Sequence, residues 1–112
     1  MEKTEKIEAY FEAMKKESEN NITSGANKAY GAWYYRDGDE IRFDGFLWDN
    51  EVHDFIDTMR KAGIETFVFT NQSTALMDNL HGFAAEGCKM DGLCTIKRKG
   101  GKEEVKGIRI RL

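Results

Sequence analysis

The stretch from Ile64 to Thr70, Ile-Glu-Thr-Phe-Val-Phe-Thr, constrains the fold of this 112-residue chain more than any other. It is filled with β-branched and aromatic side chains, and it lies between Gly63 and the polar pair Asn71-Gln72. This pattern predicts a well-buried strand. Because side chains alternate between the two faces of a strand, burial of both sets would make it the central strand of its sheet.

Two helical patterns flank this strand. Before it, apolar residues at helical spacing predict a helix over residues 50–62, with Asp49 as its cap and Gly63 as its left-handed end. After it, Asn71 or Ser73 is expected to cap a helix that stops at Gly87. The side chains expected on the inward face of this second helix are Leu76, Leu80, Phe83 and Ala84. The first three are expected to pack on Phe67 and Phe69 or on the opposite set, Ile64, Thr66 and Val68.

The N-terminal third holds one clear helix and one ambiguous stretch. The spacing of Ile7, Tyr10, Phe11 and Met14 predicts a helix over residues 4–17, capped by Thr4. Residues 26–35 again show helical spacing, but aromatic residues around Asp37-Gly38-Asp39 also fit a hairpin. We favour a helix to about Tyr35, then a turn and a short extended piece at residues 41–43. The hairpin is the alternative.

The C-terminus predicts a β-hairpin. Residues 88–99 and 102–112 are extended segments joined at Gly100-Gly101. In the second segment apolar residues (Ile108, Ile110, Leu112) alternate with Gly107, Arg109 and Arg111. The apolar face is expected to cover the helices and the two arginines to point outward. Lys97 would join them if the pairing register places it on their face.

Together these elements predict one α+β domain over residues 1–112. We expect a small, mainly antiparallel sheet with a C-terminal β-hairpin, packed against three or four helices. The length suits one domain, and no internal repeat or shift in composition marks a second.

Composition excludes several classes of protein. Aromatic residues make up 12% of the chain, enough to close a core, so a disordered tail is excluded. No apolar run approaches the roughly 18 residues of a membrane span, and residues 1–6 do not resemble a signal peptide. We therefore expect a cytoplasmic protein with no membrane partner, whose Cys88 and Cys94 are reduced thiols.

Charge is unevenly distributed along the chain. Residues 1–56 carry a net charge of −6 and residues 57–112 a net charge of +3. Such asymmetry can reflect a basic binding face or head-to-tail self-association, although solvated faces also produce it.

The junction between the predicted strand and the helix after it is one candidate site. Free backbone N–H groups and the helix dipole favour anions there, and the available hydrogen-bonding side chains are Asn71, Gln72, Ser73 and Thr74. The residues also serve simply as helix caps, and no Walker lysine or GxGxxG accompanies them. Helix capping is therefore the favoured interpretation, and an anion-binding site is the alternative.

Other catalytic or metal-binding patterns are lacking. Cys88 and Cys94 lie six residues apart, and neither they nor His53 and His81 form a tight ligand pair. We predict no metal, no cofactor and no catalytic residue. Enzymatic activity is uncertain, and its absence is the favoured hypothesis.

The predicted hairpin is the second candidate site. Residues 95–112 carry a net charge of +5, so Lys97, Arg109 and Arg111 could contact a nucleic-acid backbone. The hairpin lacks interleaved aromatic side chains, however, and lysines also protect edge strands from aggregation. Nucleic acid is a possible partner that we do not favour.

Two stretches carry a resemblance: Phe46-Leu47-Trp48-Asp49, and residues 70–77 running on to Cys94. From about Phe46 onward, the chain resembles a family of small uncharacterised proteins of gut bacteria, often encoded near genes of conjugative elements. The resemblance implies no activity, cofactor or site residue. A looser similarity is to the C-terminal part of GNAT-type acetyltransferases, but this chain lacks their pyrophosphate-binding loop, Gln/Arg-x-x-Gly-x-Gly/Ala.

We therefore predict a small accessory or interaction protein, acting through an unknown protein partner or by self-association, and associated with a mobile element. The alternatives are a ligand-binding or enzymatic domain that uses residues 70–74, and nucleic-acid binding through the hairpin.

Overall fold

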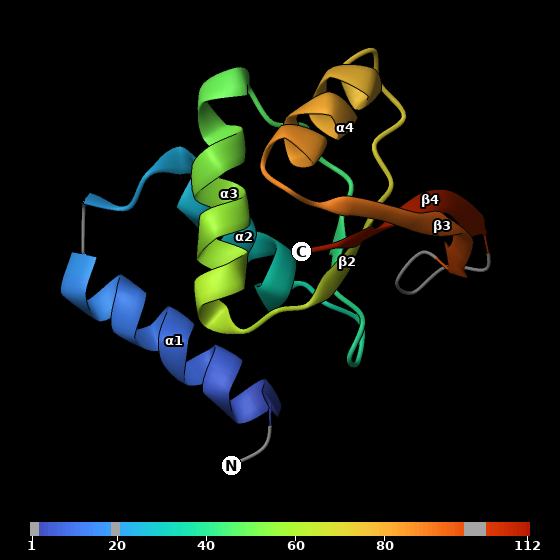
Figure 1. Ribbon diagram of the computed structural model, residues 1–112. Helices are drawn as coiled ribbons and strands as arrows, with labels where there is room; N and C mark the ends of the chain where they lie inside the picture. Colours follow the sequence, from blue (N-terminus) through green and yellow to red (C-terminus); the bar gives the residue numbers. More distant parts are fainter. Residues whose placement is uncertain (1–2, 19–20, 98–102) are drawn as a thin grey trace.

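The described residues form four helices and four strands in the order α1, α2, β1, α3, β2, α4, β3, β4 (Figure 1). The computed structural model describes residues 3–18, 21–97 and 103–112. The helices are α1 (Lys3–Ser18), α2 (Ser24–Tyr34), α3 (Asp49–Ala62) and α4 (Leu76–Ala85). The strands are β1 (Arg42–Phe43), β2 (Thr66–Phe69), β3 (Lys89–Lys97) and β4 (Glu104–Arg111). The predicted Gly100-Gly101 turn lies outside the described residues.

The strands form one mixed sheet in the order β1-β2-β4-β3. β1 runs parallel to β2, whereas β4 pairs antiparallel with both β2 and β3. The predicted α+β class and the pairing of the two C-terminal segments are therefore confirmed. β2 is central, as predicted, and both Phe67 and Val68, which point to opposite faces, are buried.

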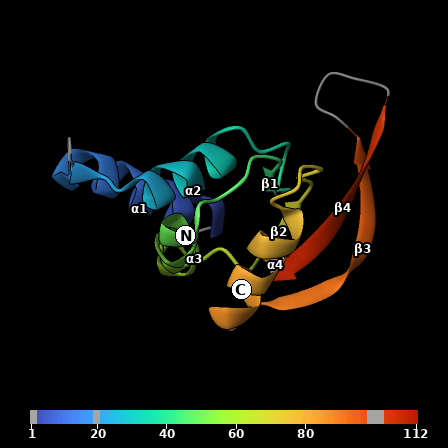
Figure 2. The ribbon, with the colours of Figure 1, turned by 90° about the horizontal axis from the view of Figure 1, so that it is seen from above.

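One face of the sheet carries the hydrophobic core, and we call it the helix face. It presents Phe43, Phe67, Phe69, Ile108 and Ile110, which cross-strand pairing places side by side. Phe55 of α3 packs against Phe43 and Phe67, and Phe83 of α4 packs against Phe67 and Phe69. α1 and α2 form a further layer on α3, as Figure 2 shows.

The opposite face carries Arg42, Arg109 and Arg111, and we call it the arginine face. Arg109 and Arg111 thus point away from the helices, as predicted. The sheet curls around this face: the Arg42 guanidinium of β1 donates a hydrogen bond to the Lys97 carbonyl of β3, although β1 and β3 are the two edges. On this face Gly107 of β4 leaves room for the Val68 side chain of β2, because a Cβ at Gly107 would lie 2.7 Å from Val68 Cγ1.

A bulge in β3 determines which way its outer half faces. Lys89 pairs with Arg111, but the register shifts between Met90 and Leu93, and Gly92 takes a φ of 99° there. A shift of one residue turns the side chains beyond it to the opposite face. Lys97 consequently pairs with Glu104 on the helix-face side of the hairpin and does not join Arg109 and Arg111.

The helices agree with prediction except at their ends. α2 is a helix, so the favoured interpretation is confirmed and Asp37 and Glu40 close only a tight turn. Thr4 lies inside α1, and Thr23 caps α2. Corrections also apply to the predicted caps Asp49, Asn71 and Ser73 and to the predicted inward residue Ala84. Asp49 is the first residue of α3, α4 begins only at Leu76, and Ala84 is exposed.

Candidate functional site

The predicted residues 71–74 do not converge on one site. Asn71 is buried, and its amide donates to the Gly45 carbonyl at 2.8 Å while its Oδ1 accepts from the backbone N and Oγ of Ser73, both at 2.7 Å. These bonds tie together the loops that follow β1 and β2. Gln72 and Ser73 then line two different hollows.

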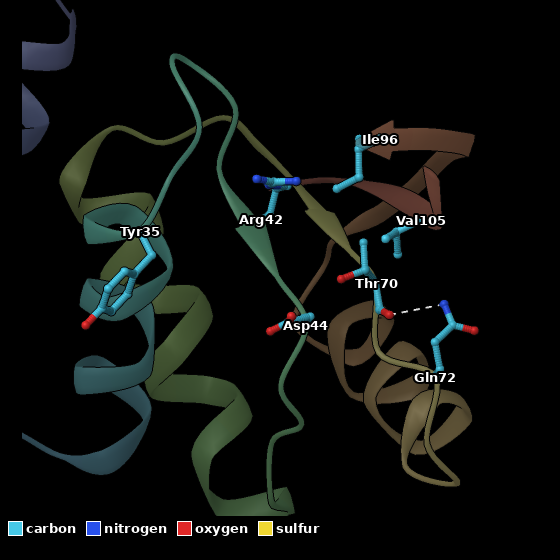
Figure 3. A pocket seen from close by; sticks show the side chains of 7 residues that line it. All are labelled: Tyr35, Arg42, Asp44, Thr70, Gln72, Ile96 and Val105. Atoms are coloured by element: carbon cyan, nitrogen blue, oxygen red, sulfur yellow. Dashed lines mark hydrogen bonds between the residues drawn. The ribbon is translucent and has the colours of Figure 1, made fainter. Parts of the chain in front are cut away.

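Gln72 lines a cavity of about 400 Å³ on the arginine face (Figure 3). Its amide nitrogen donates to the carbonyls of Thr70 and Lys106, each at 3.1 Å. Arg42 points into the same cavity, but its guanidinium already contacts the Lys97 carbonyl and the Asp37 carboxylate. The cavity is lined by Tyr35, Arg42, Asp44, Thr70, Gln72, Ile96 and Val105.

Ser73 and Thr74 line a second cavity, of about 490 Å³, between the loop at residues 46–48 and the start of α4. We call it the acidic aromatic site; its walls also include Phe46, Leu47, Trp48, Asp49, Ala75, Asp78 and Asn79. The Trp48 side chain is 63% exposed, and its ring meets that of Phe46 edge to face at 4.9 Å. Both stretches that carry the family resemblance contribute to this cavity.

Asn79 fixes the loop that presents these aromatic rings. Its side chain is 1% exposed, its Oδ1 accepts from the Leu47 backbone N at 3.0 Å, and its Nδ2 donates to the Leu47 carbonyl at 2.7 Å. The two bonds satisfy both backbone groups of a buried residue. They also join α4 directly to the loop between β1 and α3.

Glu51 anchors the same loop from α3. Its carboxylate accepts a hydrogen bond from the Trp48 backbone N at 2.8 Å, which forms the reach-back half of a capping box, and contacts Lys28 Nζ at 2.8 Å. Burial alone raises the pKa of Glu51, but the hydrogen bonds from Lys28, Trp48 and Ser24 outweigh it and hold the pKa below its ordinary value. Lys28 also lies over the Phe46 ring, 5.1 Å from its centroid.

A groove between α3 and α4 continues the acidic aromatic site. It encloses about 490 Å³, and it shares Asp49 and Asp78 with that site. Its other lining residues are Val52, His53, His81, Gly82, Ala85 and Glu86. The absence of a side chain at Gly82 lets the helices approach, because a Cβ there would lie 3.2 Å from both methyl groups of Val52.

His53 and Glu86 form an ion pair at one end of this groove, with Nδ1 and Oε1 2.7 Å apart. The hydrogen bond and the charge of Glu86 raise the pKa of His53 above its ordinary value, because both favour the protonated ring. Among the residues that the structure describes, no lysine or arginine lines either hollow. The surface across the two hollows is therefore acidic.

The three cations predicted to contact nucleic acid are not brought together. Arg111 makes an ion pair with Asp91 at 2.6 Å, and Arg109 lines a hollow that also includes Asp39 and Glu40. Lys97 lies on the other side of the hairpin, as described above. Acidic side chains thus accompany both arginines.

The predicted histidines, His53 and His81, both line the α3–α4 groove, and neither predicted thiol lines it. Cys88 is buried against Arg60, whose Nη2 lies 3.8 Å from Sγ, and burial raises the pKa of the Cys88 thiol. Cys94 is half-buried on β3. Among the described residues, no three His, Cys, Asp or Glu side chains are grouped so that they could hold a metal ion.

Sequence reasoning missed the residues that give the acidic aromatic site its character, namely Phe46, Trp48, Asp49 and Asp78. A weak signal existed. Trp48 and Asp49 directly precede the predicted helix, so the Trp48 side chain does not belong to the apolar stripe that the helix buries. A large aromatic side chain outside that stripe is a candidate for a binding surface. Asp78 carried no signal, since an acidic residue in the first turn of a helix is ordinary.

This architecture is an α+β domain whose mixed sheet carries helices on one face. In the parts of the chain that the structure describes, no helix is long and apolar enough to cross a membrane. Residues 25–112 match a family described as a domain of unknown function, DUF7698, and the chain belongs to that family. The match begins at the second residue of α2 and includes every later element. The family's description names no activity, source or gene neighbourhood, and no curated protein or solved structure matches the chain significantly.

Proposed function

We propose that this domain is a protein-interaction module that binds a basic segment of a partner protein at the acidic aromatic site. The observation that carries the proposal is the pairing of Asp49 and Asp78 with the exposed Trp48 ring in a hollow whose described lining residues include no lysine or arginine. The accessory role predicted from the sequence is consistent with such a module. A cytoplasmic location, where both cysteines would remain reduced thiols, also fits it.

Local electrostatics favour a cation over an anion. The N-termini of α3 and α4 both point to this site, and each carries about half a positive charge. Asp49 and Asp78 lie in the first turns of these helices and each contributes a full negative charge. The carboxylates therefore outweigh the helix dipoles, and the site attracts guanidinium or ammonium groups.

The aromatic rings suit the same ligand. A cation over an indole ring gains about 0.5–2 kcal/mol, and a guanidinium also stacks on the ring while donating to a nearby carboxylate. Lys28 already shows this geometry on the Phe46 ring. The Trp48 ring and the two carboxylates offer the corresponding contacts to a residue from outside the chain.

Isothermal titration calorimetry at low ionic strength tests the proposal. The probe is a flexible hexapeptide with four Lys or Arg residues, and a peptide with Glu in their place is the ligand control. We expect the basic peptide to bind, and Asp49→Asn with Asp78→Asn to weaken binding at least tenfold. Removing two exposed carboxylates from α1, by Glu8→Gln with Glu12→Gln, changes the net charge equally and should weaken it much less.

Equal weakening by both double variants would mean that only the net charge matters and would contradict the proposal. So would binding of the acidic peptide with similar affinity.

A further inference from the structure

We propose that the acidic aromatic site binds residues 97–102 of a second copy of this chain, so that copies associate head to tail. This inference rests on the proposed function, and it names the partner of that site. The segment reads Lys-Arg-Lys-Gly-Gly-Lys, with four cations and no carboxylate in six residues. No other stretch of the sequence is as densely basic.

Charge complementarity supports a second copy as the occupant. The acidic aromatic site and the α3–α4 groove gather three carboxylates, from Asp49, Asp78 and Glu86. Of the basic segment, the structure describes Lys97, which is exposed. Opposite patches on different copies attract each other and accelerate their encounter.

A hydrogen bond fixes the end of β3 from which the basic segment follows. The Lys97 carbonyl accepts the hydrogen bond from Arg42, which holds this end of β3 over the arginine face. α3 and α4, whose N-termini form the acidic aromatic site, pack on the helix face. A contact of the segment with its own site would leave the protein monomeric at every concentration, so the concentration dependence of the mass distinguishes it from a contact between copies.

The symmetry of such an assembly follows from its two different surfaces. A segment that binds a separate site makes a heterologous contact, which either closes into a ring or continues as an open chain. Because the contact is electrostatic and lies at the surface, it weakens as salt is added. Weight-average mass should therefore rise with protein concentration at low ionic strength and return to that of the monomer at high salt.

Sedimentation equilibrium of charge-reversal variants tests this arrangement. Asp49→Lys with Asp78→Lys makes the site basic, and Lys97→Glu with Lys99→Glu makes the segment acidic. We expect each variant alone to sediment as a monomer, because its site and its segment then carry like charge. An equimolar mixture should associate again, because each site meets a segment of opposite charge. Lys15→Glu with Lys16→Glu on α1 is the matched control and should associate like the parent chain.

The outcomes separate this inference from the proposed function. If the parent chain stays monomeric at every concentration while the basic hexapeptide binds, the partner is not a second copy and the inference fails alone. If neither association nor peptide binding occurs, both fail. Association that survives both reversals shows another interface and overturns the inference. Circular dichroism checks the fold, and Asp49→Asn with Asp78→Asn replaces the site variant if that variant is unfolded.

Discussion

Asn79→Ala tests how the loop of the acidic aromatic site is held in place. It leaves the aromatic and acidic side chains of the site unchanged. The Asn79 amide is buried and makes both hydrogen bonds to the backbone of Leu47. Removing it leaves one buried N–H and one buried C=O without a partner, at about 1–3 kcal/mol each. Water from the adjacent cavity can reach part of the space that the amide leaves. We therefore expect the free energy of unfolding to fall by about 3 kcal/mol, toward the low end of the summed range for the two groups.

This loss converts into a measurable change in melting temperature. At about 2.1 cal/mol/K per residue, unfolding this chain has an entropy of about 0.24 kcal/mol/K, so the melting temperature should fall by about 12 °C. Urea unfolding followed by circular dichroism measures the free energy directly. The exposed His81 lies on the same helix, and His81→Ala should change stability by less than about 0.5 kcal/mol.

Asn79→Asp refines the test. An ionised carboxylate keeps an acceptor for the Leu47 N–H but repels the Leu47 carbonyl, whereas a protonated carboxyl can serve both. The stability of this variant relative to the parent chain should therefore increase as pH falls. A loss below about 1 kcal/mol for Asn79→Ala, or the absence of any relative gain at low pH for Asn79→Asp, would refute the reasoning.

Further predictions concern the sheet and two ion pairs. Gly107→Ala should lower the free energy of unfolding by about 1–3 kcal/mol, because the added methyl group overlaps Val68; an unchanged urea midpoint would contradict the close approach. Glu51→Gln should cost about 2 kcal/mol at pH 7, because it removes a charged hydrogen-bond partner. Since the pKa of Glu51 is lowered in the folded state, the cost should shrink as pH falls through that pKa; a pH-independent cost in urea unfolding would be the contrary result. Glu86 raises the pKa of His53, so the ion pair stabilises the fold below pH 6.5, and this stabilisation is lost as pH rises through the pKa of His53 in the folded state. Glu86→Gln should lower the pKa of His53, as measured by an NMR titration. An unchanged pKa would exclude the pair in solution.

Local pattern was sufficient for the order of the elements and for the packing faces of β2 and β4. The alternation of Ile108 and Ile110 with Arg109 predicted which side of β4 faces the helices, and the β-branched run at residues 64–70 predicted the central strand. Both signals depend only on the period of a strand.

Features that depend on distant partners were not predictable in this way. The Glu51 carboxylate, held by Lys28, accepts the hydrogen bond from the Trp48 backbone N at the start of α3. Because Glu51 lies within the helix and its partner Lys28 is distant in the sequence, the local pattern predicted Asp49 as the cap instead. Asn79 lies on the inward face of α4 at helical spacing, but its reason to be buried is Leu47, 32 residues away.

Single residues redirected the rest of the candidate site. The Asn71 side chain turns the loop so that Gln72 and Ser73 line different hollows. The bulge at Gly92 sends Lys97 to the face opposite Arg109. At the bulge, a one-residue shift reverses where the later side chains of β3 point, and composition does not reveal such shifts.

The indole N–H resonances of the two tryptophans provide the most direct test of binding at the acidic aromatic site. Trp33 is buried in the core, whereas Trp48 is exposed beside Asp49 and Asp78. In a titration of ¹⁵N-labelled protein with the basic hexapeptide, the account predicts that the Trp48 indole signal shifts and saturates while the Trp33 signal stays in place. A titration in which the peptide binds but the Trp48 signal does not move would contradict the account.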